Sequence, residues 1–452
     1  MADQTHASDI LPDGSDRGQP VPGAPPGGQD GVADYDVAVI GASLAGCTAA
    51  ILLGRAGARV ALVEKRPDPL AFKRVCTHFI QSSAIATLER LGLLGPMEAA
   101  GGQRTRPRIW SRWGWIVSSS DALVPSGINL RREIFDPMIR RAAADVPGVE
   151  PMLGWGAHAL MLEEGRVTGV EVRDSHDKSL RLSARLVIGA DGRDSRVAEL
   201  ASVSTRTIPH GRIAYGAYFE GPSPVGAPDG SAWFLDPDWA AAFPTDSGLT
   251  FYATMPTKER LPEFRRDPEQ ALTKLISELP DAPPILASRM VGSIVGKLDM
   301  PNVIHRPTAP GLALVGDAAL ATDPLWGVGC GWALQSSEWL VDSVVPALAG
   351  SESMEKGLER YRRRYGRALR GHMFLIHDYA GARKLNPVER MLFAGAARDA
   401  RVARHFEAFG SRNTGPARMF ASALPRAALV NARHALRGAR ANRAATAQPG
   451  SA

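Results

Sequence analysis

Two runs of consecutive apolar residues lie near the start of the chain, one on each side of a helical pattern. They are YDVAVIG (35–41) and ARVALVEKR (58–66), and β-branched runs without polar alternation are typical of parallel strands buried on both faces. Residues 44–55 are almost wholly apolar and end just before Gly57, which predicts a buried helix. The pattern therefore predicts a βαβ unit.

The pattern changes twice further along the chain. Strand-like runs recur at 159–174, around a turn, and at 185–192 and 313–319. Between 205 and 300, β-type runs alternate with Pro and Asp turns, as in an antiparallel sheet, and from Gly331 onward the pattern is helical. We expect an α/β (α+β) fold in which a parallel-sheet domain is interleaved with an antiparallel domain and followed by helices.

Charge is distributed unevenly over the 452 residues. The net charge of +6 is the sum of −5 over residues 1–34, +7 over residues 411–452, and +4 over the 376 residues between them. The Gly- and Pro-rich head is predicted to be disordered. The alanine-rich tail carries no recognisable nucleic-acid module, so nucleic acid is not expected as a partner. A basic amphipathic helix that contacts a membrane is the alternative role for the tail.

Cysteine usage and hydropathy narrow the class of protein. Cys47, Cys76 and Cys330 are odd in number and widely spaced without CxxC, so neither a disulfide framework nor a metal site is predicted. No apolar run approaches the roughly 18 residues of a membrane span, and the first residues lack the regions of a signal peptide. We expect a cytoplasmic protein with reduced thiols.

The turn after the first strand carries the first candidate binding site. Gly41 and Gly46 bracket GASLAG between the predicted strand and helix, where a dinucleotide fingerprint belongs. Ser43 replaces its middle glycine, and it is small enough to let backbone N–H groups approach a pyrophosphate. Glu64 ends the second strand, where a carboxylate can bind ribose hydroxyls. These residues predict dinucleotide binding.

Two later segments indicate which dinucleotide is bound. VIGADGRDSRVA (187–198) and LALVGDAALATDPLWGVGCGWALQSSEWL (312–340) resemble the DG and GD segments of glutathione-reductase-type FAD oxidoreductases. With the fingerprint, in this order, they resemble the p-hydroxybenzoate-hydroxylase superfamily, which includes flavin monooxygenases, geranylgeranyl reductases and flavin-dependent halogenases. The resemblance implies FAD as the cofactor and a Rossmann FAD-binding domain interleaved with a substrate domain.

The resemblance also implies a set of FAD-binding residues. Asp317 would bind the ribityl chain, and Arg132, before a helix predicted from Asp136 to Ala144, would reach the cofactor. From the residues alone, Asp317 as a helix cap and Arg132 and Arg74 as surface arginines stay open. The predicted FAD-binding residues are Gly41, Ser43, Leu44, Ala45, Gly46, Glu64, Lys65, Arg74, Arg132, Asp191, Asp317, Pro324, Gly327, Val328 and Gly329.

Residues for chemistry and for the substrate carry a weaker signal. His78, in the same segment as Cys76, is the one candidate catalytic residue, and a structural histidine is its alternative. Tyr215, Trp239 and Trp326 are predicted to contact the substrate, with an ordinary sheet core as the alternative.

Departures from the superfamily motifs bear on the reaction. Leu320 follows GDAA where the hydroxylases have His, and the string from Asp323 to Gly329 looks more like the reductase and halogenase branches. The lysine that a halogenase needs is missing, since none occurs between Lys73 and Lys178.

We predict an FAD-dependent monooxygenase of secondary metabolism that hydroxylates or epoxidises a small hydrophobic substrate through a flavin C4a-hydroperoxide. NAD(P)H would be the electron source, directly or through a partner flavin reductase. A geranylgeranyl-reductase-like alkene reductase is the alternative, ahead of a flavin-dependent halogenase.

The predicted organisation follows from these segments. It comprises a disordered head (1–34), an FAD-binding domain (35–104, 131–204 and 301–350), a substrate domain (105–130 and 205–300), C-terminal helices (351–410) and a basic tail (411–452).

Overall fold

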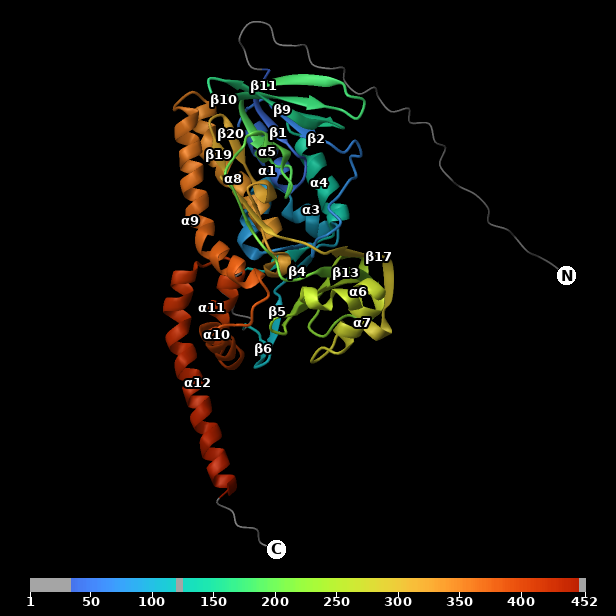
Figure 1. Ribbon diagram of the computed structural model, residues 1–452, viewed down its shortest axis with the longest axis vertical. Coiled ribbons are helices and arrows are strands. Elements are labelled where there is room, and N and C mark those ends of the chain that lie inside the picture. The colour runs from blue at the N-terminus through green and yellow to red at the C-terminus, as the bar shows by residue number, and fades with distance from the viewer. Residues whose placement is uncertain (1–33, 119–124, 447–452) are drawn as a thin grey trace, which may run out of the picture.

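The computed structural model describes residues 34–118 and 125–446. Apart from Asp34, the predicted acidic head lies outside the described residues. Figure 1 shows an upper part around a large sheet, a lower part around a second sheet, and long helices along one side of both. The mixed α/β fold predicted from the sequence is confirmed.

The upper part is built on an eight-stranded sheet. Its strands are β1 (Tyr35–Ile40), β2 (Val60–Glu64), β8 (Val149–Leu153), β9 (Gly156–Glu163), β10 (Arg166–Arg173), β11 (Ser179–Gly189), β19 (Thr308–Ala309) and β20 (Leu312–Leu314). β20, β11, β1, β2 and β8 run parallel in this order, with β19 at one edge and the β9–β10 hairpin continuing from β11. Val37, Val39 and Leu62 are fully buried, as expected of parallel strands covered on both faces.

Helices cover the faces of this sheet. They are α1 (Leu44–Arg55), α2 (Ile85–Leu91), α3 (Leu94–Ala99), α4 (Arg132–Ala144), α5 (Arg196–Leu200) and α8 (Gly329–Leu348). The predicted βαβ unit is confirmed, and α1 has the predicted bounds. The prediction for α4 is wrong by four residues, because the helix begins at Arg132, whose side chain pairs with Asp136 one turn later.

The lower part is built on a seven-stranded sheet. Its strands, in spatial order, are β17 (Arg289–Lys297), β13 (Ala214–Glu220), β16 (Leu249–Met255), β15 (Trp239–Pro244), β14 (Ser231–Phe234), β5 (Arg108–Ser111) and β6 (Gly114–Ile116). Side chains alternate between two cores: Trp239 and Phe243 face one, and Ala240 and Ala242 face the other, which α6 (Leu261–Arg266) and α7 (Pro268–Ser277) cover.

Two small sheets join the two parts. One contains β3 (Phe79–Ile80), β7 (Gly127–Asn129) and β4 (Gln103–Thr105), and the other contains β12 (Thr205–Ile208), β18 (Asn302–His305) and β21 (Leu320–Ala321). β3 and β21 therefore bring the residues after β2 and after β20 to the junction between the large sheets.

Helices form the C-terminal part, as predicted. They are α9 (Met354–Ala380), α10 (Pro387–Arg398), α11 (Ala400–Gly410) and α12 (Pro416–Thr446). α9 packs on α8, whereas α10 and α11 pack with the first half of α12 against the seven-stranded sheet (Figure 1). Among the described residues, no helix has both the length and the hydropathy needed to cross a membrane.

Candidate functional site

The turn between β1 and α1 is shaped for close backbone contact. Gly41 has a φ of +108°, and a Cβ on it would lie 2.4 Å from the carbonyl oxygen of Ala190. A Cβ on Gly46 would lie 1.7 Å from the carbonyl oxygen of Gly41. Within α1, all of which the structure describes, no side chain caps the N-terminus and the first turn holds no acidic residue. Backbone N–H groups there are available to an anion.

Glu64 lies at the end of β2, beside this turn, and is 5% exposed. Its carboxylate accepts hydrogen bonds from the Ala42 N–H at 3.0 Å and from the Arg66 side chain at 3.0 Å. Burial disfavours its charge, but the hydrogen bonds from Arg66 and Ala42 outweigh burial and lower the pKa of Glu64. An ionised carboxylate beside the dinucleotide turn is the acceptor that ribose hydroxyls need.

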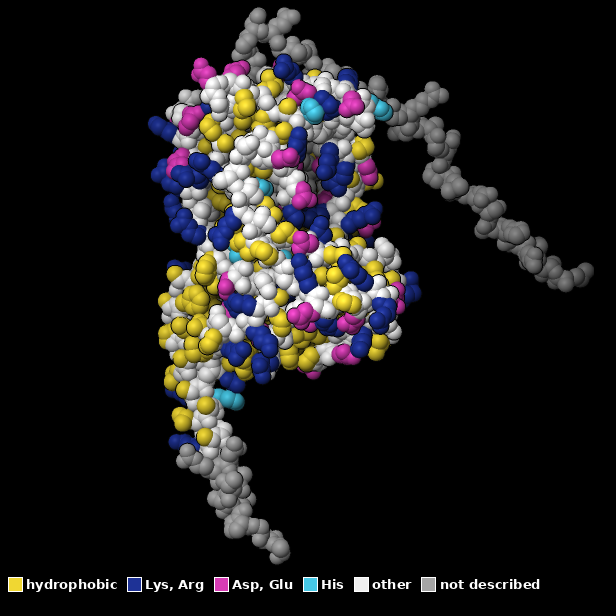
Figure 2. All heavy atoms as spheres, viewed as in Figure 1, with side chains coloured by type: hydrophobic (Ala, Val, Ile, Leu, Met, Phe, Trp, Pro, Cys, Tyr) yellow, Lys and Arg dark blue, Asp and Glu magenta, His cyan; other side chains and the backbone are white. Residues whose placement is uncertain are grey.

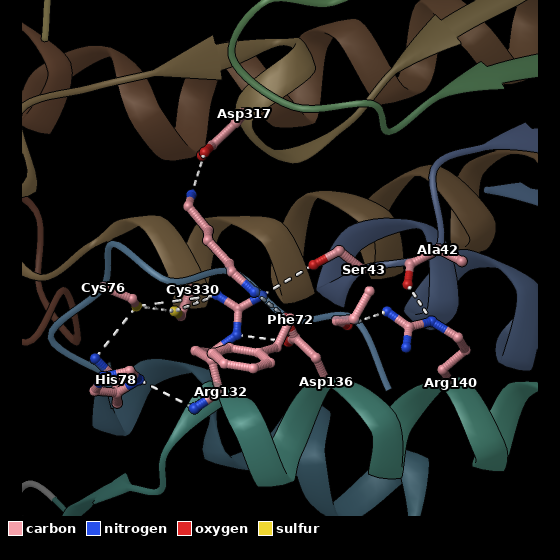
Figure 3. A network of polar contacts seen from close by, with 12 residues as sticks. Ala42, Ser43, Phe72, Cys76, His78, Arg132, Asp136, Arg140, Asp317 and Cys330 are labelled. Carbon is pink, nitrogen blue, oxygen red and sulfur yellow. Dashed lines mark hydrogen bonds and ion pairs between the residues drawn. The ribbon is translucent and has the colours of Figure 1, made fainter. Parts of the chain in front are cut away.

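Arg132, at the start of α4, links the turn to the rest of the site (Figure 3). Its Nη2 donates to Ser43 Oγ at 2.9 Å, and its Nε donates to Asp136 Oδ1 at 2.6 Å. Its Nη1 lies 3.7 Å from Cys330 Sγ, at the start of α8. Burial disfavours its charge, but Asp136 together with Cys330 and Cys76 outweighs burial and raises the pKa of Arg132, so this arginine is a fixed buried cation.

Two thiols meet beside Arg132. Cys76 Sγ and Cys330 Sγ are 3.7 Å apart, although 254 positions separate them in the chain. The Cys330 thiol lowers the pKa of Cys76, and the same contact together with burial raises the pKa of Cys330. The pair therefore holds one proton more tightly than the other, next to a permanent positive charge.

His78, the candidate catalytic residue, is buried below this pair and has a φ of +64°. Its Nδ1 accepts from the Arg132 N–H at 3.1 Å, and its Nε2 lies 2.5 Å from the Tyr218 hydroxyl. Burial lowers the pKa of His78 to about 4. A neutral ring held from both sides fits the structural alternative at least as well as a role in proton transfer.

Asp317, after β20, is labelled in Figure 3, and its carboxylate forms an ion pair with Lys73. Lys73 Nζ lies 2.8 Å from Asp317 Oδ2, and their side chains are 49% and 23% exposed. Asp317 raises the pKa of Lys73. Burial disfavours the charge of Asp317, but Lys73 outweighs it and lowers the pKa of Asp317. Both groups are ionised and reachable, and Lys73 is a site residue that the sequence analysis did not select.

Three other predicted FAD-binding residues border the site, and Asp191 lies beside the dinucleotide turn, since a Cβ on Gly41 would lie 3.0 Å from its Cα. Asp191 accepts from Ser195 Oγ at 2.6 Å and from the Val197 N–H at 3.0 Å, and thereby ties the turn after β11 to α5. Lys65 and Arg74 are exposed. Their assignment to the cofactor stays a prediction.

The Gly-rich segment after β21 is a short turn that leads directly into α8. Gly327 has a φ of +62°, and Pro324, Val328 and Gly329 belong to the same run. A Cβ on Gly329 would lie 3.9 Å from Asp317 Oδ1, so the start of α8 lies beside that carboxylate. Leu44 and Ala45 are buried in the first turn of α1 and can offer only backbone groups.

A cavity of about 470 Å³ lies between this segment, the seven-stranded sheet and the C-terminal helices. Trp239 and Trp326 line it, as do Phe79 and Gln81 from the segment that carries the Cys76 thiol. Its far wall is made by side chains of α10, α11 and α12, including Phe393, Phe406, Phe409, Met419 and Phe420. Tyr215 does not line it, and stacks instead on Phe264 at 4.9 Å in the other core.

The residues present fit FAD. The glycine turn leaves no room for side chains, and the start of α1 offers free N–H groups. Glu64 is an ionised acceptor, and Asp317 is a half-buried acceptor near the Gly-rich start of α8. Among the described residues no group of acids, histidines and cysteines could hold a metal ion.

Comparison with known proteins agrees with this fit. A family model described as "FAD binding domain" matches residues 34–370. Digeranylgeranylglycerophospholipid reductase 1 of Methanopyrus kandleri is 28% identical over 351 residues, which are 74% of this chain and 86% of that protein.

Solved structures share the fold. The myxobacterial chondrochloren halogenase CndH superposes with a TM-score of 0.65 at 23% identity, over 83% of this chain and 97% of that chain. PqsL of Pseudomonas aeruginosa, described as a probable FAD-dependent monooxygenase, superposes with a TM-score of 0.61 at 21% identity, over 77% of this chain and 98% of that chain.

Proposed function

The chain belongs to the FAD-binding-domain family, and from that premise we propose that this FAD-dependent oxidoreductase reduces a carbon–carbon double bond of an apolar molecule held in the cavity. Reduced FAD would supply a hydride when bound. NAD(P)H, directly or through a flavin reductase, is the proposed source of electrons.

The contact between Cys76 and Cys330 carries the proposal. Saturation of an alkene needs a proton at the carbon that does not receive the hydride. The two sulfurs lie within hydrogen-bonding distance of each other, beside Arg132. Cys76 is also next in the chain to Thr77, which lines the cavity. The thiol pair is therefore a proton store between the predicted flavin site and the cavity, whereas His78 is neutral and held on both ring nitrogens.

The similarity to reductases that act on geranylgeranyl chains gives further support. The cavity offers what such a chain requires, since aromatic and aliphatic side chains dominate its wall. In this chain the substrate class would be an apolar polyene or a prenyl-bearing molecule.

Oxygen insertion, the reaction predicted from the sequence, is the second candidate. The similarity to PqsL favours it, and an apolar cavity can also hold an aromatic ring. The paired thiols count against it, because a thiolate beside an oxidant is itself oxidised.

The mass of the product separates the two reactions. Under argon, with chemically reduced enzyme in D₂O and a prenyl alcohol as substrate, we expect a saturated product that carries two deuterium atoms from solvent, one through the exchangeable N5 position of the reduced flavin and one through the proton donor. A product formed only in air, and heavier by one oxygen atom, would establish the monooxygenase instead.

Cysteine variants then test the proton store. Cys76→Ser and Cys330→Ser should slow alkene saturation by about a hundredfold while the amount of bound flavin stays unchanged. Cys47→Ala is the matched control, since Cys47 is a buried thiol of α1 that faces the sheet core. Unchanged turnover in both serine variants would remove the thiols from the mechanism.

A further inference from the structure

α12 consists of two unlike halves. Its first half packs on the molecule, with Met419, Ala423 and Ala427 buried against α10 and α11. Its second half projects away from the body (Figure 1), and residues 432–440 are exposed without exception. A projecting helical arm gains nothing from the core, so its sequence is free to serve a partner.

The arm is basic and free of acids. Residues 411–452 hold seven arginines and no Asp or Glu. Arg426 forms an ion pair with Asp399 at 2.7 Å and so belongs to the body. Arg433, Arg437 and Arg440 are exposed further along the arm, on successive turns of one side.

Apolar side chains lie on the same side of the arm as these arginines. Leu429 is 48% exposed and Leu436 is 62% exposed, and two turns of helix place them on one face. Alanines fill most of the positions around them. Figure 2 shows hydrophobic and basic side chains side by side along α12, below a hydrophobic patch over the C-terminal helices. One side of the arm therefore combines exposed leucines with arginines, and small residues surround them.

We propose that the second half of α12 binds the surface of an anionic lipid bilayer. Basic residues are attracted to anionic headgroups, and Leu429 and Leu436 can enter the interface beside them. A second copy of the chain is disfavoured, because two acid-free arms repel each other. Nucleic acid would use the arginines but would bury the leucines between them against charged phosphates.

The position of the cavity agrees with such a surface. Met419 and Phe420, at the start of α12, line the cavity, so the helix that would lie on the bilayer is continuous with a cavity wall. An apolar substrate dissolved in the bilayer would meet the protein at this side. The inference does not rest on the reaction, because it concerns the arm alone.

Sedimentation with vesicles tests the proposal on the full chain. We expect binding to phosphatidylcholine vesicles that contain roughly one third phosphatidylglycerol at about 0.1 M salt, and loss of binding at about 1 M salt. Vesicles of phosphatidylcholine alone should bind at least about tenfold less protein.

Charge variants identify the surface. Arg433→Gln, Arg437→Gln and Arg440→Gln together should weaken vesicle binding by at least about tenfold with unchanged bound flavin and melting temperature. The matched control is Arg181→Gln, Arg265→Gln and Arg266→Gln, which removes the same charge from exposed positions on β11 and α6. Leu429→Ser with Leu436→Ser should also weaken binding.

Either of two results would overturn the proposal. One is equal sedimentation of the arm variant and the control. The other is tighter binding of the chain to duplex DNA of mixed sequence than to anionic vesicles at the same salt, which would assign the arm to nucleic acid. Alkene reduction in detergent is measured separately, so failure of the proposed reaction leaves the vesicle result intact.

Discussion

At the scale of single residues, the dinucleotide turn is the least tolerant part of the site. Gly46→Ala would place a methyl group 1.7 Å from the carbonyl oxygen of Gly41, and neither backbone can give way without moving α1 from the sheet. We expect loss of most bound flavin and a lower melting temperature. Flavin absorbance per unfolded chain measures the first and thermal unfolding the second. Gly95→Ala, where a Cβ meets nothing within 4 Å, is the control.

Buried histidines make stability depend on pH. Burial lowers the pKa of His78, His372 and His377 to about 4, below their ordinary value of 6.5. The unfolded chain takes up protons below about pH 6.5 while the folded chain stays neutral at these rings down to about pH 4. The free energy of unfolding should therefore fall as pH drops through this window.

Denaturant titrations at several pH values measure that slope. In His78→Gln the slope between pH 6.5 and 4 should be shallower than in the parent chain, by up to about 3 kcal/mol over the window. His176→Gln, an exposed histidine on the turn after β10, is the control. An unchanged slope in His78→Gln would mean that the His78 ring titrates normally.

The sequence reveals some site residues and hides others for a definite reason. Ser43 and Glu64 belong to a local motif whose spacing is fixed by one strand, one turn and one helix, so the motif alone selects them. The contact of Cys76 with Cys330 joins residues 254 positions apart, and no local pattern indicates it. The sequence analysis did not select Lys73 for the same reason, since its partner Asp317 lies 244 positions further along the chain.

At the scale of elements, a buried ion pair joins three of them. Arg212, before β13, and Asp323, after β21, are both fully buried and approach to 3.5 Å. Arg212 also donates to the carbonyl oxygens of Pro237 and of Tyr379, at the end of α9. Asp323 accepts from the Leu325 N–H and so shapes the segment that leads to Gly327.

Removal of the cation should be costly. In Arg212→Met the buried Asp323 carboxylate loses its guanidinium partner and keeps only the His210 ring, at 3.2 Å, and we expect a loss of about 3–5 kcal/mol of unfolding free energy in denaturant titration. The double variant Arg212→Met with Asp323→Asn should be more stable than Arg212→Met alone, because it removes the orphaned charge. The opposite order would show that the pair carries little electrostatic energy.

The start of α4 illustrates how an element boundary can mislead. The predicted helix starts at Asp136, and Asp followed by Pro is also typical of a helix N-terminus. In the structure Asp136 lies one turn inside the helix and its carboxylate holds Arg132 instead. This i,i+4 ion pair within α4 stabilises the earlier start of the helix.

At the scale of the whole molecule, the cavity has walls from distant parts of the chain. The βαβ unit and the helical C-terminal part could be predicted because hydrophobic periodicity marks them. The far wall of the cavity could not be predicted. The packing of α10, α11 and α12 on the seven-stranded sheet depends on side-chain shape rather than on hydrophobic periodicity.

Substrate size should therefore respond to the C-terminal helices. Phe406 of α11 is 6% exposed, lines the cavity and packs edge-on against Phe393 at 4.8 Å between ring centroids. Phe406→Leu should enlarge the cavity, cost about 1–3 kcal/mol of stability, and raise kcat/KM for longer substrates relative to shorter ones. Val402→Ala, buried in the same helix but absent from the cavity lining, should lower stability without changing that ratio.

The cofactor residues and the far wall of the cavity come from successive parts of the chain, and this sets the order in which they form on the ribosome. Every residue that fits the cofactor precedes the end of α8, whereas the far wall of the cavity begins at α10. A nascent chain thus carries a complete flavin cradle while the helices that will enclose the substrate are still being translated. Loading of the cofactor can precede closure of the cavity, and a chain that terminates early would be a coloured protein with an open, inactive cleft.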